Sequence, residues 1–170
     1  MKEWQSEYKK KVIDPSDVQE AAESIRASGK TIATLNGSFD LLHSGHLQSI
    51  YEASQLADIL IVALNSDSSI KRYKDPSRPI ITLEHRLQMI AALDWVDFAT
   101  WFDETDPRRL LEKIKPDVHV NGIEWKNNCV EEALVASYGG KMHYVPLISG
   151  LSTTQIVNNI ANLYDQAKVN

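Results

Sequence analysis

Short apolar runs rich in β-branched residues alternate with amphipathic helical patterns along nearly the whole chain, and this alternation most restricts the possible folds. The apolar runs cover residues 31–35, 59–64, 96–101, 118–120 and 141–145. A short, almost continuously apolar run indicates a strand that is covered on both faces, as in a parallel sheet. Alternating strands and helices therefore predict the α/β class, with a doubly wound parallel sheet of the Rossmann-like kind. Ligands of such sheets bind beyond the carboxyl ends of the strands.

The helical patterns indicate one domain over residues 14–170. Asp14-Pro15 supplies a cap followed by a proline at the first helical position, and Gly29 ends that helix. Later helices are expected around residues 47–51, 83–91, 107–114, 130–138 and 152–164. Residues 1–13 precede the pattern, and we expect them to form an arm that is frayed or docks on a partner.

Composition and charge argue against several classes of protein. Hydrophobic residues make up 43% of the chain and charged residues 24%, which is typical of a globular domain. No apolar run approaches the ~20 residues of a membrane span. The polar amino terminus is not a secretory signal, so we expect a cytoplasmic protein without membrane contact. A net charge of −5 and the lack of an aromatic-basic stripe argue against nucleic acid as a partner. Cys129 is the only cysteine, which excludes an internal disulfide and a cysteine-cluster metal site.

The most informative segment is Asn36-Gly-Ser-Phe-Asp-Leu-Leu-His-Ser-Gly-His46, between the first predicted strand and a helix. His43 and His46 stand three apart across Gly45, so both imidazoles can face one point. Gly45 lets a phosphate approach the backbone, and the helix N-terminus attracts an anion. Imidazole N–H groups could then meet the charge on a phosphoryl group under attack. Two surface histidines are the plain alternative, and a metal site is weaker because no third ligand lies nearby.

Three further features each allow a structural as well as a functional interpretation. Asp40 could hold its own turn through backbone N–H groups, and Phe39 could belong to the core. Gly150-Leu-Ser-Thr-Thr-Gln155 opens the last helix with capping-box spacing, and its three hydroxyl side chains also suit a polyphosphate. The basic run 71–79 follows Asn65-Ser-Asp67; it is either a solvated loop or a mobile lid that brings cations to phosphates.

Together these segments resemble the cytidylyltransferase-like nucleotidyltransferases over about residues 10–165. Residues 36–46 match G-x-F-D-x-x-H-x-G-H, residues 150–157 match G-x-S-T-T-x-I-[IV], and residues 65–79 match N-S-D…K-R-x-K…R-P. The resemblance implies a Rossmann-like nucleotidyltransferase fold. It also implies transfer of a nucleoside monophosphate from an NTP to a phosphorylated small molecule, with release of pyrophosphate.

The same resemblance implies roles for individual residues. The catalytic residues are expected to be His43, His46 and Lys71. The nucleotide-binding residues are expected to be Asn36, Gly37, Ser38, Phe39, Gly45, Arg72, Arg78, Arg86, Gly122, Ser152, Thr153 and Thr154. The substrate-binding residues are expected to be Asp40, Asn65, Asp67 and Trp125. No protein metal site is expected, because Mg²⁺ would be held mainly by the triphosphate. A homodimer is implied by the resemblance alone.

Within that family the chain is most similar to the adenylyltransferase domain of ADP-heptose synthases, which uses ATP and heptose 1-phosphate. Asn36–Asp40 reads like its T-N-G-C-F-D, and Leu147 stands where glycerol-3-phosphate cytidylyltransferases place an arginine. Asn121 and Ile123 depart from that group's V-K-G-G-D-[YW] and put the acceptor or base pocket in doubt. The alternatives are a cytidylyltransferase using CTP with glycerol 3-phosphate or another alcohol phosphate, and a nucleotide-binding module without turnover.

Overall fold

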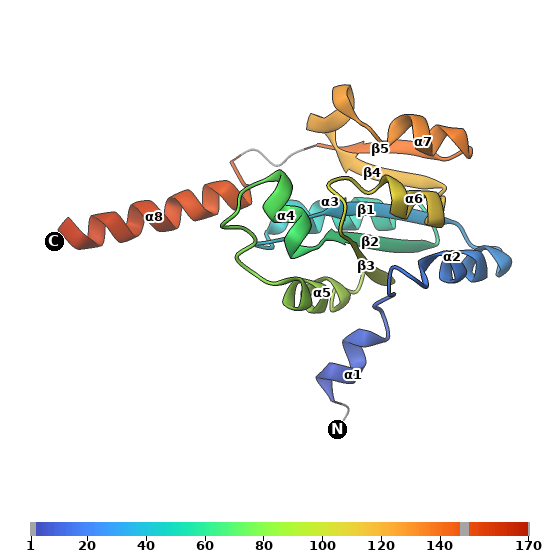
Figure 1. Cartoon of the computed structure of the whole chain (residues 1–170), viewed down its shortest axis with the longest axis horizontal. Helices are drawn as coiled ribbons and strands as arrows, with labels where there is room; N and C mark the ends of the chain where they lie inside the picture. The colour runs from blue at the N-terminus through green and yellow to red at the C-terminus, as the bar shows by residue number, and fades with distance from the viewer. Residues whose placement is uncertain (1–2, 147–149, 170) are drawn as a thin grey trace.

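Five parallel strands form the centre of the structure, a computed structural model that describes residues 3–146 and 150–169. The strands are β1 (Ile32–Gly37), β2 (Ile59–Asn65), β3 (Phe98–Phe102), β4 (Val118–Gly122) and β5 (Lys141–Val145). Their order in the sheet is β3-β2-β1-β4-β5, and every neighbouring pair is parallel (Figure 1). The order reverses between β1 and β4, which is where a doubly wound sheet opens a crevice for a ligand. The predicted fold class is confirmed.

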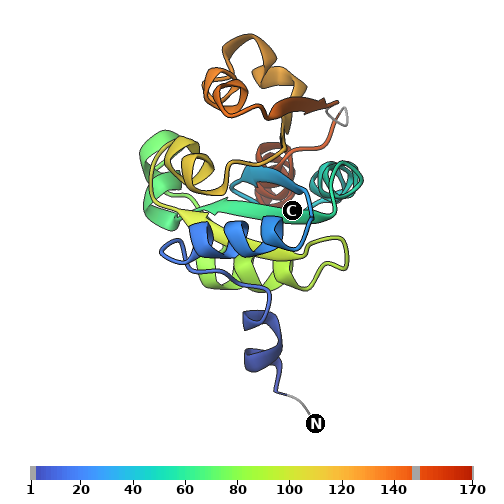
Figure 2. The ribbon, with the colours of Figure 1, turned by 90° about the vertical axis from the view of Figure 1, so that its right-hand side faces the viewer.

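Two helical layers cover the sheet, and the alternation of β2 side chains explains why (Figure 2). Leu60, Val62 and Leu64 pack on the side of α3 (Ser44–Ser54) and α5 (Leu83–Ala91). The intervening side chains of β2 pack on the side of α2 (Val18–Ala27) and α6 (Arg108–Ile114). Both faces of β2 are buried, as its continuous apolar run predicts.

The central strands extend past their apolar runs into polar residues. β1 ends with Asn36-Gly37, β2 with Asn65, and β4 with Asn121-Gly122. Backbone pairing does not depend on apolar side chains, so the predicted ends of these strands fall one or two residues short. The extra residues place amide side chains at the carboxyl edge of the sheet.

The remaining helices are α1 (Trp4–Lys9), α4 (Asp67–Tyr73), the 3-10 helix η1 (Ile123–Asn128), α7 (Glu132–Ser137) and α8 (Thr153–Val169). α8 starts beyond the carboxyl end of the sheet and projects away from the rest of the domain (Figure 1). Within the described ranges, no helix combines the length and apolarity that crossing a membrane requires.

The amino-terminal part of the chain differs from the prediction. The Asp14 carboxylate accepts the N–H of Ser16, and residues 15–17 form a turn, so α2 begins only at Val18. Residues 11–13 lie along the edge of the sheet, where Val12 pairs with Ala99 of β3, and Trp4 of the largely exposed α1 donates to Gln88 on α5. The segment thus covers the outer edge of the sheet in its own domain.

Candidate active site

The histidine turn connects β1 to α3, with His43 as the residue that caps the helix. The rings of His43 and His46 stack, with their centroids 3.8 Å apart and an interplanar angle of 25°. The backbone N–H of His43 donates to Nδ1 of His46 over 3.4 Å. Because Nδ1 of His46 accepts, the proton of the neutral ring must be on Nε2. His46 can therefore donate one hydrogen bond, from Nε2.

Both imidazoles are neutral at pH 7 in the free protein. Burial, together with smaller contributions from His43 and the charge of Lys74, lowers the pKa of His46 to about 4. Burial also lowers the pKa of His43. The turn therefore offers N–H donors rather than fixed positive charges to a ligand.

Gly45 leaves room for the stacked ring of His43. A Cβ at position 45 would lie 3.0 Å from Cε1 of His43, so a side chain there would push that ring by a few tenths of an ångström. Phe39 is 3% exposed and its ring lies 5.2 Å from that of His46. Phe39 thus belongs to the core and supports His46, which corrects its expected role as a nucleotide ligand.

The start of α8 lies against the histidine turn. Oγ1 of Thr153 is 3.5 Å from the carbonyl oxygen of Leu41, two residues before His43. At this length the hydrogen bond is weak, but it shows that the start of α8 and the histidine turn lie next to each other. Ser152 accepts the N–H of Gln155 over 3.1 Å, which is the predicted cap. Two segments from opposite ends of the domain are therefore brought together. Leu147 lies outside the described residues.

Two buried polar atoms of the histidine segment have no hydrogen-bond partner within residues 3–146 and 150–169. They are Oδ1 of Asn36, at the end of β1, and Nδ1 of His43. Buried polar atoms are nearly always paired in native proteins. These two atoms are accordingly the first candidates for contact with a ligand in the crevice between β1 and β4.

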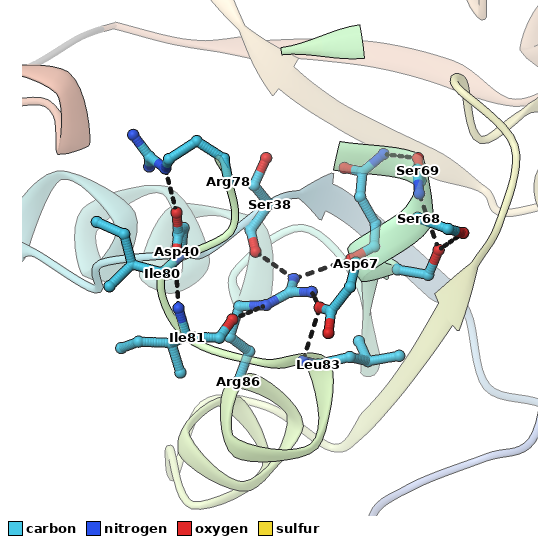
Figure 3. Close-up of polar contacts among 12 residues, drawn as sticks. Ser38, Asp40, Asp67, Ser68, Ser69, Arg78, Ile80, Ile81, Leu83 and Arg86 are labelled. Carbon is cyan, nitrogen blue, oxygen red and sulfur yellow. Dashed lines mark hydrogen bonds and ion pairs between the residues drawn. The ribbon is translucent and has the colours of Figure 1, made fainter. Parts of the chain in front are cut away.

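Asp40 holds the segment between α4 and α5 instead of facing a ligand (Figure 3). Its Oδ2 accepts Nε of Arg78 over 2.6 Å. Its Oδ1 accepts the N–H groups of Ile80 and Ile81 over 2.8 and 2.9 Å. The carboxylate is buried and its oxygens are occupied, so the expected substrate contact of Asp40 is wrong in this structure. The predicted alternative was correct in kind, but the N–H groups come from a distant segment.

Arg86 is likewise committed to the fold. It is fully buried, and its Nη1 donates to the carbonyl oxygens of Ser38 and Asn65 over 2.6 and 2.9 Å. Its Nε donates to Ile81 over 2.9 Å, and its Nη2 donates to Asp67 over 2.7 Å. Four of its five N–H groups donate to the protein and the side chain is fully buried, so the structure favours a structural role for Arg86, and its expected nucleotide contact stays a prediction. The arginine ties together the ends of β1 and β2 and the start of α4.

Asn65 on β2 and Asp67 on α4 were also expected to bind the substrate, and both make hydrogen bonds within the protein. Asp67 also accepts the N–H of Leu83 over 2.8 Å, and Asn65 donates to Ser69 over 3.0 Å. Motif spacing marks such residues as important, but it does not distinguish a ligand contact from a contact that shapes the loops around the ligand.

The basic run is divided between a helix and a loop. Lys71 and Arg72 lie in the last turn of α4, so they are not part of a loop as expected. Lys71 is exposed, and Arg72 donates to the carbonyl oxygen of Asp103 beyond β3. The charge of Lys74, a weaker candidate from the same motif, acts on His46. Tyr73 was not among the expected site residues, and its hydroxyl lies 2.5 Å from that of Ser38. The K-R-x-K spacing was the only signal for Lys74.

The end of β4 forms the opposite side of the crevice. Asn121 accepts the N–H of Gly122 over 3.0 Å, and η1 follows directly. Ile123 and Trp125 of η1 are 43% and 53% exposed. The role of Trp125 in substrate binding stays a prediction.

Two hollows of the described surface lie elsewhere. One of about 290 Å³ lies between the ends of α2 and α6, and one of about 430 Å³ lies beside β5 and α7. The first contains Arg26, which donates to the carbonyl oxygens of Ile114 and Lys115 at the end of α6. Arg26 therefore serves a helix C-terminus, and Lys113 of the same hollow donates to the carbonyl oxygen of Pro15. Neither hollow contains a residue of the histidine turn.

Comparison with known proteins shows the family to which the chain belongs. Residues 34–159 match the family described as Cytidylyltransferase-like. The chain is 40% identical over 161 residues to the "Bifunctional protein HldE" of Syntrophotalea carbinolica, covering 94% of this chain and 33% of that protein. It is 42% identical over 149 residues to the protein of the same name from Hahella chejuensis, covering 87% and 31%. The chain thus spans about a third of the length of these curated relatives.

Two solved structures share the fold. The lipopolysaccharide core biosynthesis protein of Thermoplasma volcanium superposes with a TM-score of 0.59 and 28% identity, covering 71% of this chain and 98% of that one. Pantoate-beta-alanine ligase of Francisella tularensis, in complex with beta-gamma ATP and beta-alanine, gives a TM-score of 0.62 at 19% identity, covering 89% and 76%. At that identity the second likeness shows the fold alone. The chain belongs to the cytidylyltransferase-like family and is a nucleotidyltransferase.

Proposed function

We propose that the chain transfers AMP from ATP to a sugar 1-phosphate of the heptose 1-phosphate type and releases pyrophosphate. The observation that carries this proposal is the contact of Thr153 with Leu41, because it brings the hydroxyl-rich start of α8 to the histidine turn. A triphosphate in the crevice could then meet donors from both segments. The choice of ATP and a heptose phosphate is supported by the resemblance of Asn36–Asp40 to the ADP-heptose group and by the relatives named HldE.

The chemistry that these residues support is direct in-line displacement at the α-phosphorus. A phosphate oxygen of the acceptor is already anionic at neutral pH, so it attacks without a general base. The transition state then needs donors aimed at the charge that develops on the phosphoryl oxygens. Nε2–H of His46 and the backbone N–H groups in the first turn of α8 could be such donors. Losing one preorganised donor costs about 3 kcal/mol of barrier.

Magnesium enters this account as part of the substrate, Mg·ATP. Asp40 accepts three hydrogen bonds from the protein and Asp67 accepts two. Because these carboxylates are already engaged, a metal held mainly by the triphosphate fits the site. We found no cluster of three or more potential metal ligands within residues 3–146 and 150–169. The metal would neutralise charge on the leaving pyrophosphate while the phosphates and water hold it.

The proposal extends to a cytoplasmic homodimer. Ile160 and Leu163 on α8 are 59% and 68% exposed, and Ile156 continues the same face one turn earlier. An isolated helix of this length is marginal in water, so an apolar face on a projecting helix favours a partner. Sedimentation tests this part: Ile160→Lys should shift the protein toward monomer, whereas Asn158→Lys on α8 should not.

A second nucleotide remains a candidate because Asn121 and Ile123 depart from the ADP-heptose pattern at the crevice. The alternative is CTP with glycerol 3-phosphate or another alcohol phosphate. A panel of ATP and CTP against sugar 1-phosphates and alcohol phosphates, followed by pyrophosphate release, separates the two. Release with ATP and heptose 1-phosphate supports the proposal, and release only with CTP replaces it. Tight nucleotide binding without release under any acceptor would indicate a binding module.

A further inference from the structure

The ion pair between Asp40 and Arg78 has a geometry that suggests a purpose beyond stability. Oδ2 of Asp40 accepts Nε of Arg78 over 2.6 Å, and Oδ1 accepts two successive N–H groups at Ile80 and Ile81. The Asp40 side chain is only 2% exposed, whereas that of Arg78 is 16% exposed. One carboxylate thus fixes both the backbone of residues 80–81 and the direction of the Arg78 guanidinium.

The two arginines of this network differ in how many guanidinium nitrogens donate to the protein (Figure 3). Arg86 uses Nε, Nη1 and Nη2 in contacts with the protein. Arg78 uses only Nε within the described residues, and its terminal nitrogens point away from Arg86 in the figure. A guanidinium held through Nε still presents a planar pair of N–H groups, which suits two oxygens of a phosphate.

The position of Asp40 in the chain places this arginine at the site. Leu41, the next residue, contacts Thr153 at the start of α8, and His43 follows two residues later. Phe39, the residue before, has φ 46°, which few non-glycine residues adopt. One short loop therefore holds the arginine, receives α8 and presents the histidines.

We propose that Asp40 is a positioning residue that aims the Arg78 guanidinium at the phosphates of the bound nucleotide. This inference rests on the proposed function. Asp40 does not touch the nucleotide, because both of its oxygens are occupied. An asparagine would keep an oxygen for the N–H groups of residues 80–81, but it would turn an N–H donor toward Nε of Arg78. A carboxylate at position 40, in contrast to an amide, is therefore required only for the hydrogen bond that holds Arg78.

A double-mutant cycle tests the proposal with Asp40→Asn, Arg78→Ala and the double variant. The readouts are the Kd for ATP, measured by titration calorimetry, and kcat and KM for pyrophosphate release. Each single variant should weaken ATP binding by about tenfold or more, and the double variant should be no worse than Arg78→Ala. Effects that multiply in the double variant would overturn the proposal. Asp14→Asn is the matched control, since Asp14 accepts from the N–H and hydroxyl of Ser16 in a turn before α2 and has no recorded contact with Arg78 within the described ranges.

Chemical rescue gives a second readout that a purely structural role would not change. Guanidinium ion, added below the concentration that unfolds the protein, should restore ATP binding to Arg78→Ala, because Asp40 is there to hold it. It should not restore binding to the double variant. Rescue that is absent in Arg78→Ala, or equal in both variants, contradicts the proposal. This comparison keeps the test decisive even if Asp40→Asn alone folds poorly, because Arg78→Ala retains Asp40.

The same measurements separate this inference from the proposed function. If the wild-type protein bound ATP but released no pyrophosphate with any acceptor, the proposed function would fail while the coupling between Asp40 and Arg78 could still be measured. If Arg78→Ala bound ATP as tightly as the wild-type protein, the inference would fail whatever the turnover.

Discussion

Thr153 and Leu41 are 112 positions apart in the sequence, yet the hydroxyl of one lies 3.5 Å from the carbonyl oxygen of the other. This contact joins the last helix to the loop that carries His43 and His46. Each segment alone has an ordinary structural explanation, as a helix cap or a turn. Their proximity is what supports a shared ligand with several phosphates.

His46→Ala should reduce kcat/KM for pyrophosphate release by about a hundredfold or more, because it removes one preorganised N–H donor. The fold should persist, since Phe39 still fills the core beneath. Steady-state kinetics and circular dichroism check both points. His85→Ala, at an exposed position on α5, is the control and should have near-normal kinetics. Near-normal rates in His46→Ala would remove His46 from the mechanism.

Thr153→Val should weaken ATP binding by about tenfold, because a hydroxyl donor near phosphate is lost with little change in shape. Calorimetry of ATP binding measures the effect. The exposed Thr105→Val is the matched control, and it should bind ATP like the wild-type protein. Equal affinities in the two variants would mean that the start of α8 does not reach the nucleotide.

Arg86→Leu should lower the free energy of unfolding by about 3–5 kcal/mol, because it leaves Asp67 and three carbonyl oxygens without their donor. Urea denaturation measures the loss. Arg109→Leu, whose side chain is 80% exposed, should change stability by less than about 0.5 kcal/mol. A stable Arg86→Leu protein that failed only in nucleotide binding would return Arg86 to the list of ligands.

Acid should destabilise the protein partly through His119. Burial lowers its pKa to about 4 from an ordinary value of 6.5. Between pH 6.5 and about pH 4, His119 is protonated in the unfolded chain but not in the folded chain, so stability falls as pH falls through that window. The loss is about 3 kcal/mol for this group. Urea denaturation at several pH values should show a shallower decline in His119→Gln than in the wild-type protein or in His85→Gln. An unchanged decline in His119→Gln would contradict this assignment.

The sequence predicted the fold class and the two segments that meet at the site, because periodicity and motif spacing are local signals. It could not predict which polar residues face the ligand. Arg86 and Arg78 were both expected to bind the nucleotide, but only the packing shows that each guanidinium nitrogen of Arg86 donates to the protein. Asp40 was misassigned for the same reason, since its partners lie about 40 positions away. The packing of residues 3–13 on α5 and β3 was also hidden, because that segment is polar in composition.

The fate of label from ATP tests the central claim most directly. With a sugar 1-phosphate acceptor, radioactivity from the α-phosphate of ATP should appear in the sugar product, and radioactivity from the γ-phosphate should appear only in pyrophosphate. Both signals should fall about a hundredfold in His46→Ala. Transfer of the γ-label to the acceptor, or an α-label that never leaves the adenosine nucleotide pool under any acceptor, would contradict the account.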